Sequence, residues 1–141
     1  MHMMQRLIAR TEGAAAIEFA FVAPAFVLIL CGLLFYGLYF GVAHGVQQLA
    51  AEAARASVAG MSASERSTLA RQQVMATIGS YPFLKADHVT VDAAPDPADP
   101  NRFAVTVRYD ASHLGLAGFG GILPIPSDQI VKTAVVRRGG F

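Results

Sequence analysis

The chain contains no tryptophan, a single cysteine and few charged residues. With only Cys31 available, an intramolecular disulfide is excluded. Charged residues make up 15% of the 141 residues and the formal net charge is +1, so we expect no binding of nucleic acid through charge. Hydrophobic residues make up 54%, which is more than an ordinary soluble domain of this length contains. The composition therefore favours a membrane segment joined to a small domain.

The longest run without a charged residue extends from Phe19 to Ala43. A helix of about 25 residues crosses a bilayer with some tilt. A removable signal peptide is the alternative, but its apolar core has only roughly 7 to 15 residues. Arg6 and Arg10 precede the run against one acid, Glu12, so the positive-inside rule places the N-terminus in the cytoplasm. We predict a leader at 1–13, a transmembrane helix at 14–43 and an extracytoplasmic region at 44–141.

The extracytoplasmic region is predicted to be α+β. Helical spacing of apolar residues continues as a stalk to about residue 59, and Gly60 suits the end of that helix. Ser62 and Glu65 have the spacing of a capping box, which predicts a second helix that ends near Gly79. Apolar residues then alternate with polar ones, which predicts a small three-stranded antiparallel sheet. The expected strands are residues 88–92, 103–109 and about 129–137, with a stiff Asp- and Pro-rich turn over 92–102.

Glu18 is an acid in the first turns of the apolar run. An ionised Glu costs on the order of 2.5 to 3.5 kcal/mol at the centre of a membrane helix, and less near an interface. If the chain were cut after Gly13, the new amine of Ala14 would lie one helical turn from the acid. In the alternative interpretation, Glu18 reaches the inner headgroups beside Arg10. The residues by themselves leave both open.

The string from Gly13 to Phe19, GAAAIEF, resembles the processing site of type IV pilin-like precursors, where a glycine precedes the cut. The longer string GAAAIEFAFVAPAFVLILCGLLFYG resembles the N-terminus of TadE-like proteins, the pseudopilins of tight-adherence (Tad/Flp) pili. The rest of the chain agrees with that family only in its layout of a membrane helix followed by a small αβ domain. Glu12 departs from the basic residue that many relatives carry before the glycine.

The resemblance implies a role for each matching residue. Gly13 would precede the cut by a prepilin peptidase, and Ala14 would become the new N-terminus. Glu18 and its aromatic neighbour Phe19 would serve assembly. The implied partners are the prepilin peptidase, another minor pilin and the major Flp pilin. The implied location is the bacterial inner membrane, with a periplasmic C-terminal domain and possible incorporation into a surface pilus that serves adhesion and biofilm formation.

Three glycines repeat at every fourth position, Gly37, Gly41 and Gly45. Such a stripe lets another helix approach closely, although the spacing is common by chance. We therefore hold helix packing at this stripe as a hypothesis.

Other patterns are weaker. The glycines of 115–121 lack the lysine and the strand-to-helix context of a phosphate loop, and we expect this apolar segment to cover the sheet or to meet a partner. The Asp residues of 92–101 lack the ligand spacing of a calcium loop, and the four histidines lack ligand spacing. We therefore predict no metal, no cofactor and no enzyme activity.

These patterns together predict a TadE-like pseudopilin, or minor pilin, that acts in pilus assembly through packing. The alternative is an unprocessed single-span receptor or sensor with a small extracytoplasmic ligand-binding domain. The mature N-terminus separates the two.

Overall fold

The computed structural model describes the backbone of residues 2–137 and the side chains of residues 13–137. Contacts divide the chain into two compact units, one up to Gly37 and one from Leu38 onwards. The first helix, α1 (His2–Ser57), belongs to both. The second unit begins at Leu38, and the limit of the membrane helix at residue 43 stays a prediction.

Helix α1 begins at His2, so the prediction that the helix starts near Ala14 is wrong. Met, Gln, Leu, Arg and Ala before Gly13 all favour a helix. Gly13 costs only about 1 kcal/mol relative to alanine in a helix interior, which does not end a helix flanked by such residues on both sides. Pro24 also lies inside α1 and does not end it.

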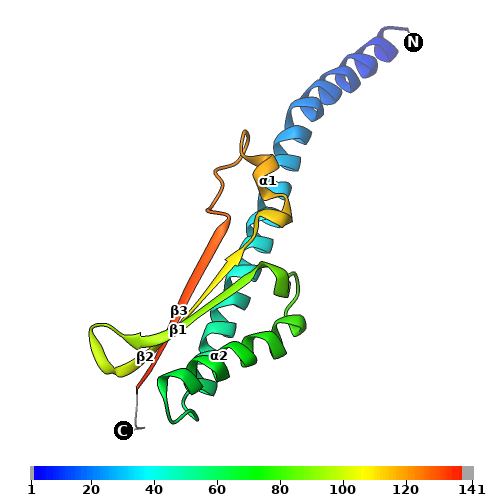
Figure 1. Ribbon diagram of the computed structural model, residues 1–141. Helices are drawn as coiled ribbons and strands as arrows, with labels where there is room; N and C mark the ends of the chain where they lie inside the picture. Colours follow the sequence, from blue (N-terminus) through cyan, green and yellow to red (C-terminus); the bar gives the residue numbers. More distant parts are fainter. Residues whose placement is uncertain (1, 138–141) are drawn as a thin grey trace. The chain divides into compact units, whose positions relative to one another are not determined.

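The second unit contains one antiparallel sheet in the order β1-β2-β3 (Figure 1). Its strands are β1 (Val89–Asp96), β2 (Asp99–Asp110) and β3 (Gln129–Arg137), with Val91 opposite Val107 and Thr106 opposite Thr133. The α+β architecture with two long helices and three antiparallel strands confirms the predicted fold class. The predicted turn over 92–102 is too long, because β1 continues to Asp96 and β2 starts at Asp99. Pro95 is tolerated there because β1 is an edge strand.

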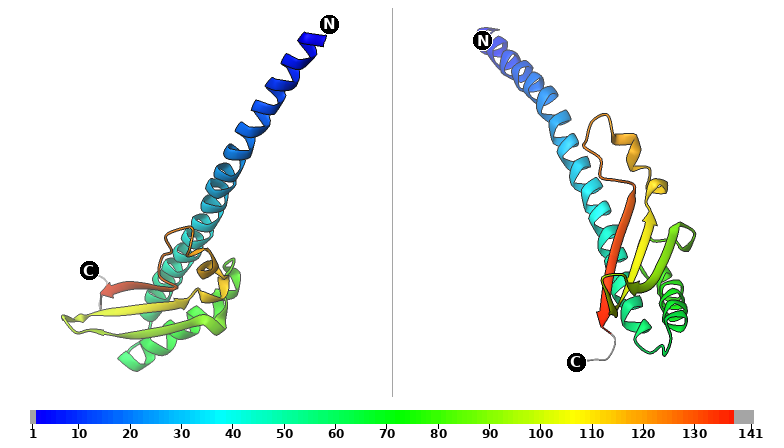
Figure 2. Two further views of the ribbon diagram at one scale, coloured as in Figure 1. Left: turned by 90° about the horizontal axis from the view of Figure 1, so that it is seen from above. Right: turned by 60° about the vertical axis from the view of Figure 1, so that its left-hand side comes forward.

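One face of the sheet packs on the helices. Strand β2 alternates buried and more exposed residues, as the period of two predicts. Helix α2 (Ala63–Thr77) lies against β1, and the part of α1 after Leu38 completes the layer (Figures 1 and 2). The two helices and the sheet share one core, whose largest fully buried side chains include Tyr109, Leu49, Val42, Val46, Val74, Val105 and Val107.

The turn between the two helices is held by the predicted capping box. The Ser62 hydroxyl accepts a hydrogen bond from the Glu65 amide at 3.1 Å. The Glu65 carboxylate in return accepts one from the amide of Met61, at 2.9 Å, one residue before the usual partner. Gly60 is buried because the backbone nitrogen of Arg66 lies 2.7 Å from where a Cβ would stand. The chain reversal therefore needs a glycine for close approach.

Four short 3-10 turns complete the described part of the second unit. The first two, η1 (Ile78–Ser80) and η2 (Ala86–His88), lie between α2 and β1. The other two, η3 (Ser112–Leu114) and η4 (Leu116–Phe119), lie in the long connection from β2 to β3. We call that connection, residues 111–128, the apolar loop. Gly115 adopts a positive φ of 69° between its two turns, a conformation that glycine permits without strain.

Candidate processing site and membrane-spanning helix

The residues of the predicted processing site lie on an exposed stretch of α1. Gly13, Ala14 and Glu18 are exposed, and the side chain of Phe19 is 72% exposed. Ala14 and Glu18 are four positions apart in the helix, so they lie on the same face, one turn apart. Among the described residues, a Cβ built on Gly13 would meet no atom within 4 Å, so packing against them does not explain the glycine. The arrangement leaves the Gly13 to Phe19 stretch available to another protein.

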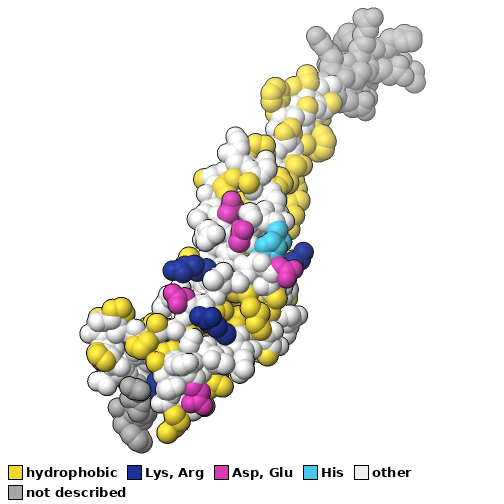
Figure 3. Space-filling model, in the orientation of Figure 1, with side chains coloured by type: hydrophobic (Ala, Val, Ile, Leu, Met, Phe, Trp, Pro, Cys, Tyr) yellow, Lys and Arg dark blue, Asp and Glu magenta, His cyan; other side chains and the backbone are white. Residues whose placement is uncertain are grey.

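Large apolar side chains are exposed around this part of α1 (Figure 3). Phe21 is 79% exposed and Leu33 and Leu34 are each 68% exposed. A soluble monomer rarely exposes so many contiguous apolar side chains to water. Within the described residues, this helix is the one long and apolar enough to cross a membrane. The helix therefore fits membrane anchoring.

The glycine stripe divides between the two units. A Cβ on Gly37 or Gly41 would meet no atom within 4 Å, so both positions leave space for another helix. At Gly45 the close approach comes from the same chain, because a Cβ there would lie 3.1 Å from Leu84 Cδ1 and 3.4 Å from Tyr81 Cδ1. Packing on a partner helix stays a prediction for the stripe, and Gly45 has a packing role inside the second unit.

A cluster that the sequence did not reveal lies where the apolar loop leaves β2. The rings of His88 and His113 stack with centroids 4.1 Å apart and planes 14° apart. The buried Tyr109 hydroxyl donates a hydrogen bond to Phe83 O and accepts one from the Lys85 amide, both at 3.1 Å. Burial raises the pKa of the Tyr109 phenol above its usual value. These contacts join residues 83–88 to the end of β2.

Asp110 lies at the base of the same loop. Its carboxylate accepts a hydrogen bond from the Ser112 amide at 2.9 Å, and the hydrogen bonds of Ser112 lower the pKa of that carboxyl. Both features are those of a turn residue. No spacing in the sequence indicated the cluster, because its members come from segments that meet only in the folded chain.

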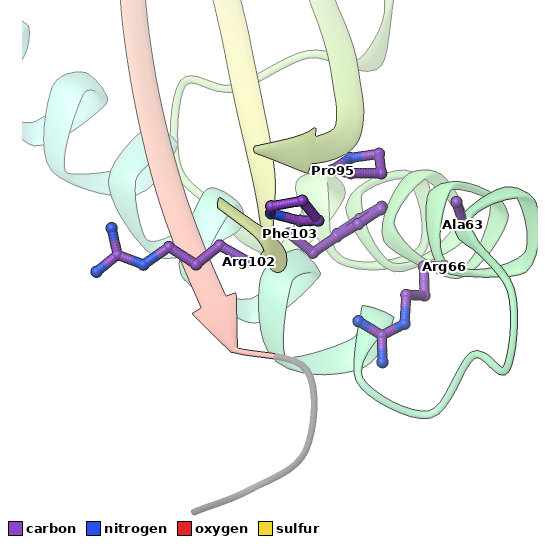
Figure 4. A pocket seen from close by; sticks show the side chains of 6 residues that line it. Ala63, Arg66, Pro95, Arg102 and Phe103 are labelled. Carbon is purple, nitrogen blue, oxygen red and sulfur yellow. The ribbon is translucent and has the colours of Figure 1, made fainter. Parts of the chain in front are cut away.

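A small cavity lies between α2 and the β1–β2 hairpin (Figure 4). Its volume is about 30 Å³, enough for about one water molecule. Arg66, which the sequence also did not single out, is buried beside it. Its Nε donates to Gly60 O at 3.0 Å and its guanidinium carbon lies 5.8 Å from the centroid of the Phe103 ring. Arg66 therefore links the turn between the two helices, through Gly60 O, to the sheet, through the Phe103 ring.

The Asp-rich hairpin uses its carboxylates for turn geometry. Asp96 accepts a hydrogen bond from the Ala98 amide at 3.0 Å, and Asp99 accepts one from the Asn101 amide at 2.9 Å. Among the residues that the structure describes, no three His, Cys, Asp or Glu side chains gather as metal ligands would.

The exposed apolar helix and the position of Gly13 at its start agree with a comparison with known families. Residues 13–55 match the family model of TadE-like protein. The match confirms the resemblance seen in the sequence. No curated protein and no solved structure matches the chain.

The TadE-like segment covers most of α1 and stops before α2 and the sheet. Its first residue is Gly13, and it extends into the second unit as far as Arg55. The match indicates a protein related to Tad pili, and the matched residues form the apolar N-terminal helix.

Proposed function

We propose that the protein is a TadE-like pseudopilin that acts as a minor pilin in a Tad/Flp pilus. The observation that carries the proposal is the TadE-like segment, which begins at Gly13 on an exposed apolar helix. The protein is made as a membrane-inserted precursor, and a prepilin peptidase cuts it after Gly13. Its function is assembly through packing, not chemistry. The second unit lies in the periplasm and meets pilus partners.

The cut provides a cation to pair with the Glu18 carboxylate. Before the cut, Glu18 is an exposed carboxylate in an apolar helix. The nearest basic residue in the sequence is Arg10, about two helical turns earlier. After the cut, the new α-amine of Ala14 lies one turn away on the same face, or reaches the acid of a neighbouring subunit. An acid in a membrane helix usually has such a partner. The pairing sets the depth and the register of one helix against the next.

The apolar surface serves two stages of assembly. In the membrane, side chains such as Phe21 and Leu33 lie in lipid. In the pilus complex, the same surface packs against helices of another minor pilin or the major Flp pilin, and Gly37 and Gly41 permit close approach. Both environments exclude water, so the transfer from lipid to subunit contacts does not expose the side chains.

Mass spectrometry of the native protein from a piliated strain tests the cut. We expect Ala14 as the first residue, and Gly13→Leu should block the cut while membrane insertion persists. Gly32→Leu makes the same change deeper in the helix and should be cut normally. An intact leader in assembled protein would contradict the proposal and favour the single-span receptor.

Glu18→Gln tests the pairing, because it keeps the shape of the side chain and removes the charge. We expect the variant to be inserted and cut, yet to co-purify poorly with pilus partners. Normal piliation and normal recovery of partners would show that Glu18 only reaches the headgroups.

A reporter fused after the last residue tests the topology. An enzyme active only in the periplasm should work there, and one active only in the cytoplasm should not. The reverse pattern would overturn the periplasmic placement of the second unit.

A further inference from the structure

The apolar loop has an unusual composition for a connection on the surface of a domain. Residues 111–127 contain no Asp, Glu, Lys or Arg. Some of its side chains are used inside the domain, because Leu116 is only 5% exposed. Others are presented outward, and Ile122 at the far part of the loop is 65% exposed. The loop therefore offers an apolar tip to its surroundings.

The loop is also ordered by its own contacts. Its ends are joined by a hydrogen bond from the Ala111 amide to Asp128 O at 2.8 Å. At the tip, the amides of Ile122 and Leu123 both donate to Phe119 O at 2.9 Å. The Cδ1 of Ile125 lies 2.6 Å from where a Cβ on Gly120 would stand, so the chain folds closely on itself. These hydrogen bonds satisfy several of the tip's backbone amides, which lowers the cost of moving the tip from water to a membrane interface.

The loop leaves the sheet at one particular end. Figures 1 and 2 show it opposite the hairpin that joins β1 to β2. The strand that follows the loop starts beside Tyr39, Phe40 and Ala43, which line one groove together with Gln129–Lys132. This is the end at which α1 enters the second unit. In the proposed function it is the end nearest the membrane.

We propose that the tip of the apolar loop, residues 118–124, dips into the outer interface of the membrane that α1 spans. The proposal rests on the membrane anchoring in the proposed function. The loop leaves the sheet at the end of the second unit where α1 enters it, and the apolar residues of α1 before that point are the proposed membrane span. An apolar tip without basic residues suits lipid contact through burial, not through attraction to anionic headgroups.

The charged residues nearest in sequence support this orientation. Asp110 precedes the loop and Asp128 is its last residue, so the acidic side chains stand at the base and none lies in the tip. The His88–His113 stack and the Tyr109 hydrogen bonds hold the same base to the sheet. These contacts fix the base of the loop on the sheet, so the tip has a defined position within the second unit.

The test uses the full chain in vesicles of zwitterionic phosphatidylcholine. A fluorophore sensitive to its surroundings is attached to single cysteines in a Cys31→Ser background. The positions are Ile122→Cys in the tip, Leu30→Cys in the span and Met61→Cys in the turn between the helices. Met61 is the matched control, because it is apolar and 87% exposed but follows the end of α1 at Ser57, about 20 Å beyond Ala43 along the helix. Lipids with a spin label on an upper acyl carbon serve as the quencher.

We expect strong quenching at position 30, clear quenching at position 122 and none at position 61. Quenching at 122 that is no stronger than at 61, with position 30 still quenched, would overturn the loop proposal and leave membrane anchoring intact. Absence of quenching at position 30 would overturn the anchoring itself, and the loop proposal with it. As a second variant, Ile122→Asp with the fluorophore at Gly121→Cys should lose the quenching that Gly121→Cys shows alone. Equal quenching with and without the acid would contradict insertion.

Discussion

Replacing Tyr109 by phenylalanine tests the hydrogen bonds that hold residues 83–85 on the sheet. Tyr109 is fully buried, so the ring stays in place and only the hydroxyl is lost. The Lys85 amide then loses its acceptor and Phe83 O loses its donor. Phe83 has a positive φ of 67°, which costs roughly 1–2 kcal/mol for a residue with a side chain. The Tyr109 hydroxyl is therefore one of the contacts that offsets a strained turn.

The expected loss is about 1–3 kcal/mol in the free energy of unfolding of the second unit, the usual cost of a buried group left without its hydrogen bond. Because 1.4 kcal/mol corresponds to tenfold, amides of β2 should exchange with solvent about 5- to 150-fold faster. Hydrogen exchange of the full chain in detergent, read by mass spectrometry over residues 103–109, measures the change.

Tyr81→Phe is the matched control. The Tyr81 hydroxyl donates to the Glu52 carboxylate at 2.9 Å, but the residue is only half-buried, so water can replace the bond. We expect a loss below about 1 kcal/mol there. Equal acceleration of exchange in the two variants would refute the argument that burial of the Tyr109 hydroxyl sets the cost.

Three further changes probe the same unit. Gly60→Ala should destabilise it by about 1–3 kcal/mol, because the new Cβ meets the backbone of Arg66, and a lower midpoint of thermal unfolding by circular dichroism checks this. Ser62→Ala removes the acceptor for the Glu65 amide and should cost about 0.5–2 kcal/mol by the same assay, with Ser64→Ala as the control inside the helix. The folded state raises the pKa of Tyr109, so the stability that this group contributes is full below pH 10.0 and is lost as the pH rises through the folded pKa. The unfolding midpoint should therefore fall above pH 10.0, and less steeply in Tyr109→Phe; an identical slope would contradict the assignment.

Local patterns in the sequence were sufficient to predict which helices and strands form and in what order, but not where each begins and ends. The uncharged run from Phe19 to Ala43 predicts a spanning helix because length and apolarity alone decide whether a helix can cross a bilayer. The Ser62 and Glu65 pair predicts the start of α2 because a cap depends on groups three residues apart. The alternation over residues 103–109 predicts the central strand because its side chains face two different environments. The resemblance to TadE-like proteins could also be recognised from the sequence, because the residues that carry it are contiguous.

Folding brings together residues whose relation no local spacing could show. Gly45 looked like part of a stripe for a partner helix, and only the folded chain shows Leu84 and Tyr81 against it. The role of Arg66 depends on Gly60 O and on the Phe103 ring, which lies 37 positions further along the chain. Such contacts arise from the way helices and strands pack, and packing depends on all the elements at once.

The limits of the elements were also decided by tertiary structure. The proline- and aspartate-rich stretch predicts a long turn, yet β1 continues through Pro95. Its pairing with β2, such as Ala94 opposite Ala104, outweighs the preference of these residues for a turn. At the start of α1, local preference decides instead. The residues before Gly13 favour a helix, so the helix continues through Gly13 and begins at His2. The chain's composition therefore determined that an apolar helix long enough to cross a membrane precedes an α+β domain. The long-range contacts of Tyr109, Arg66 and Gly45 decided how that domain is held together.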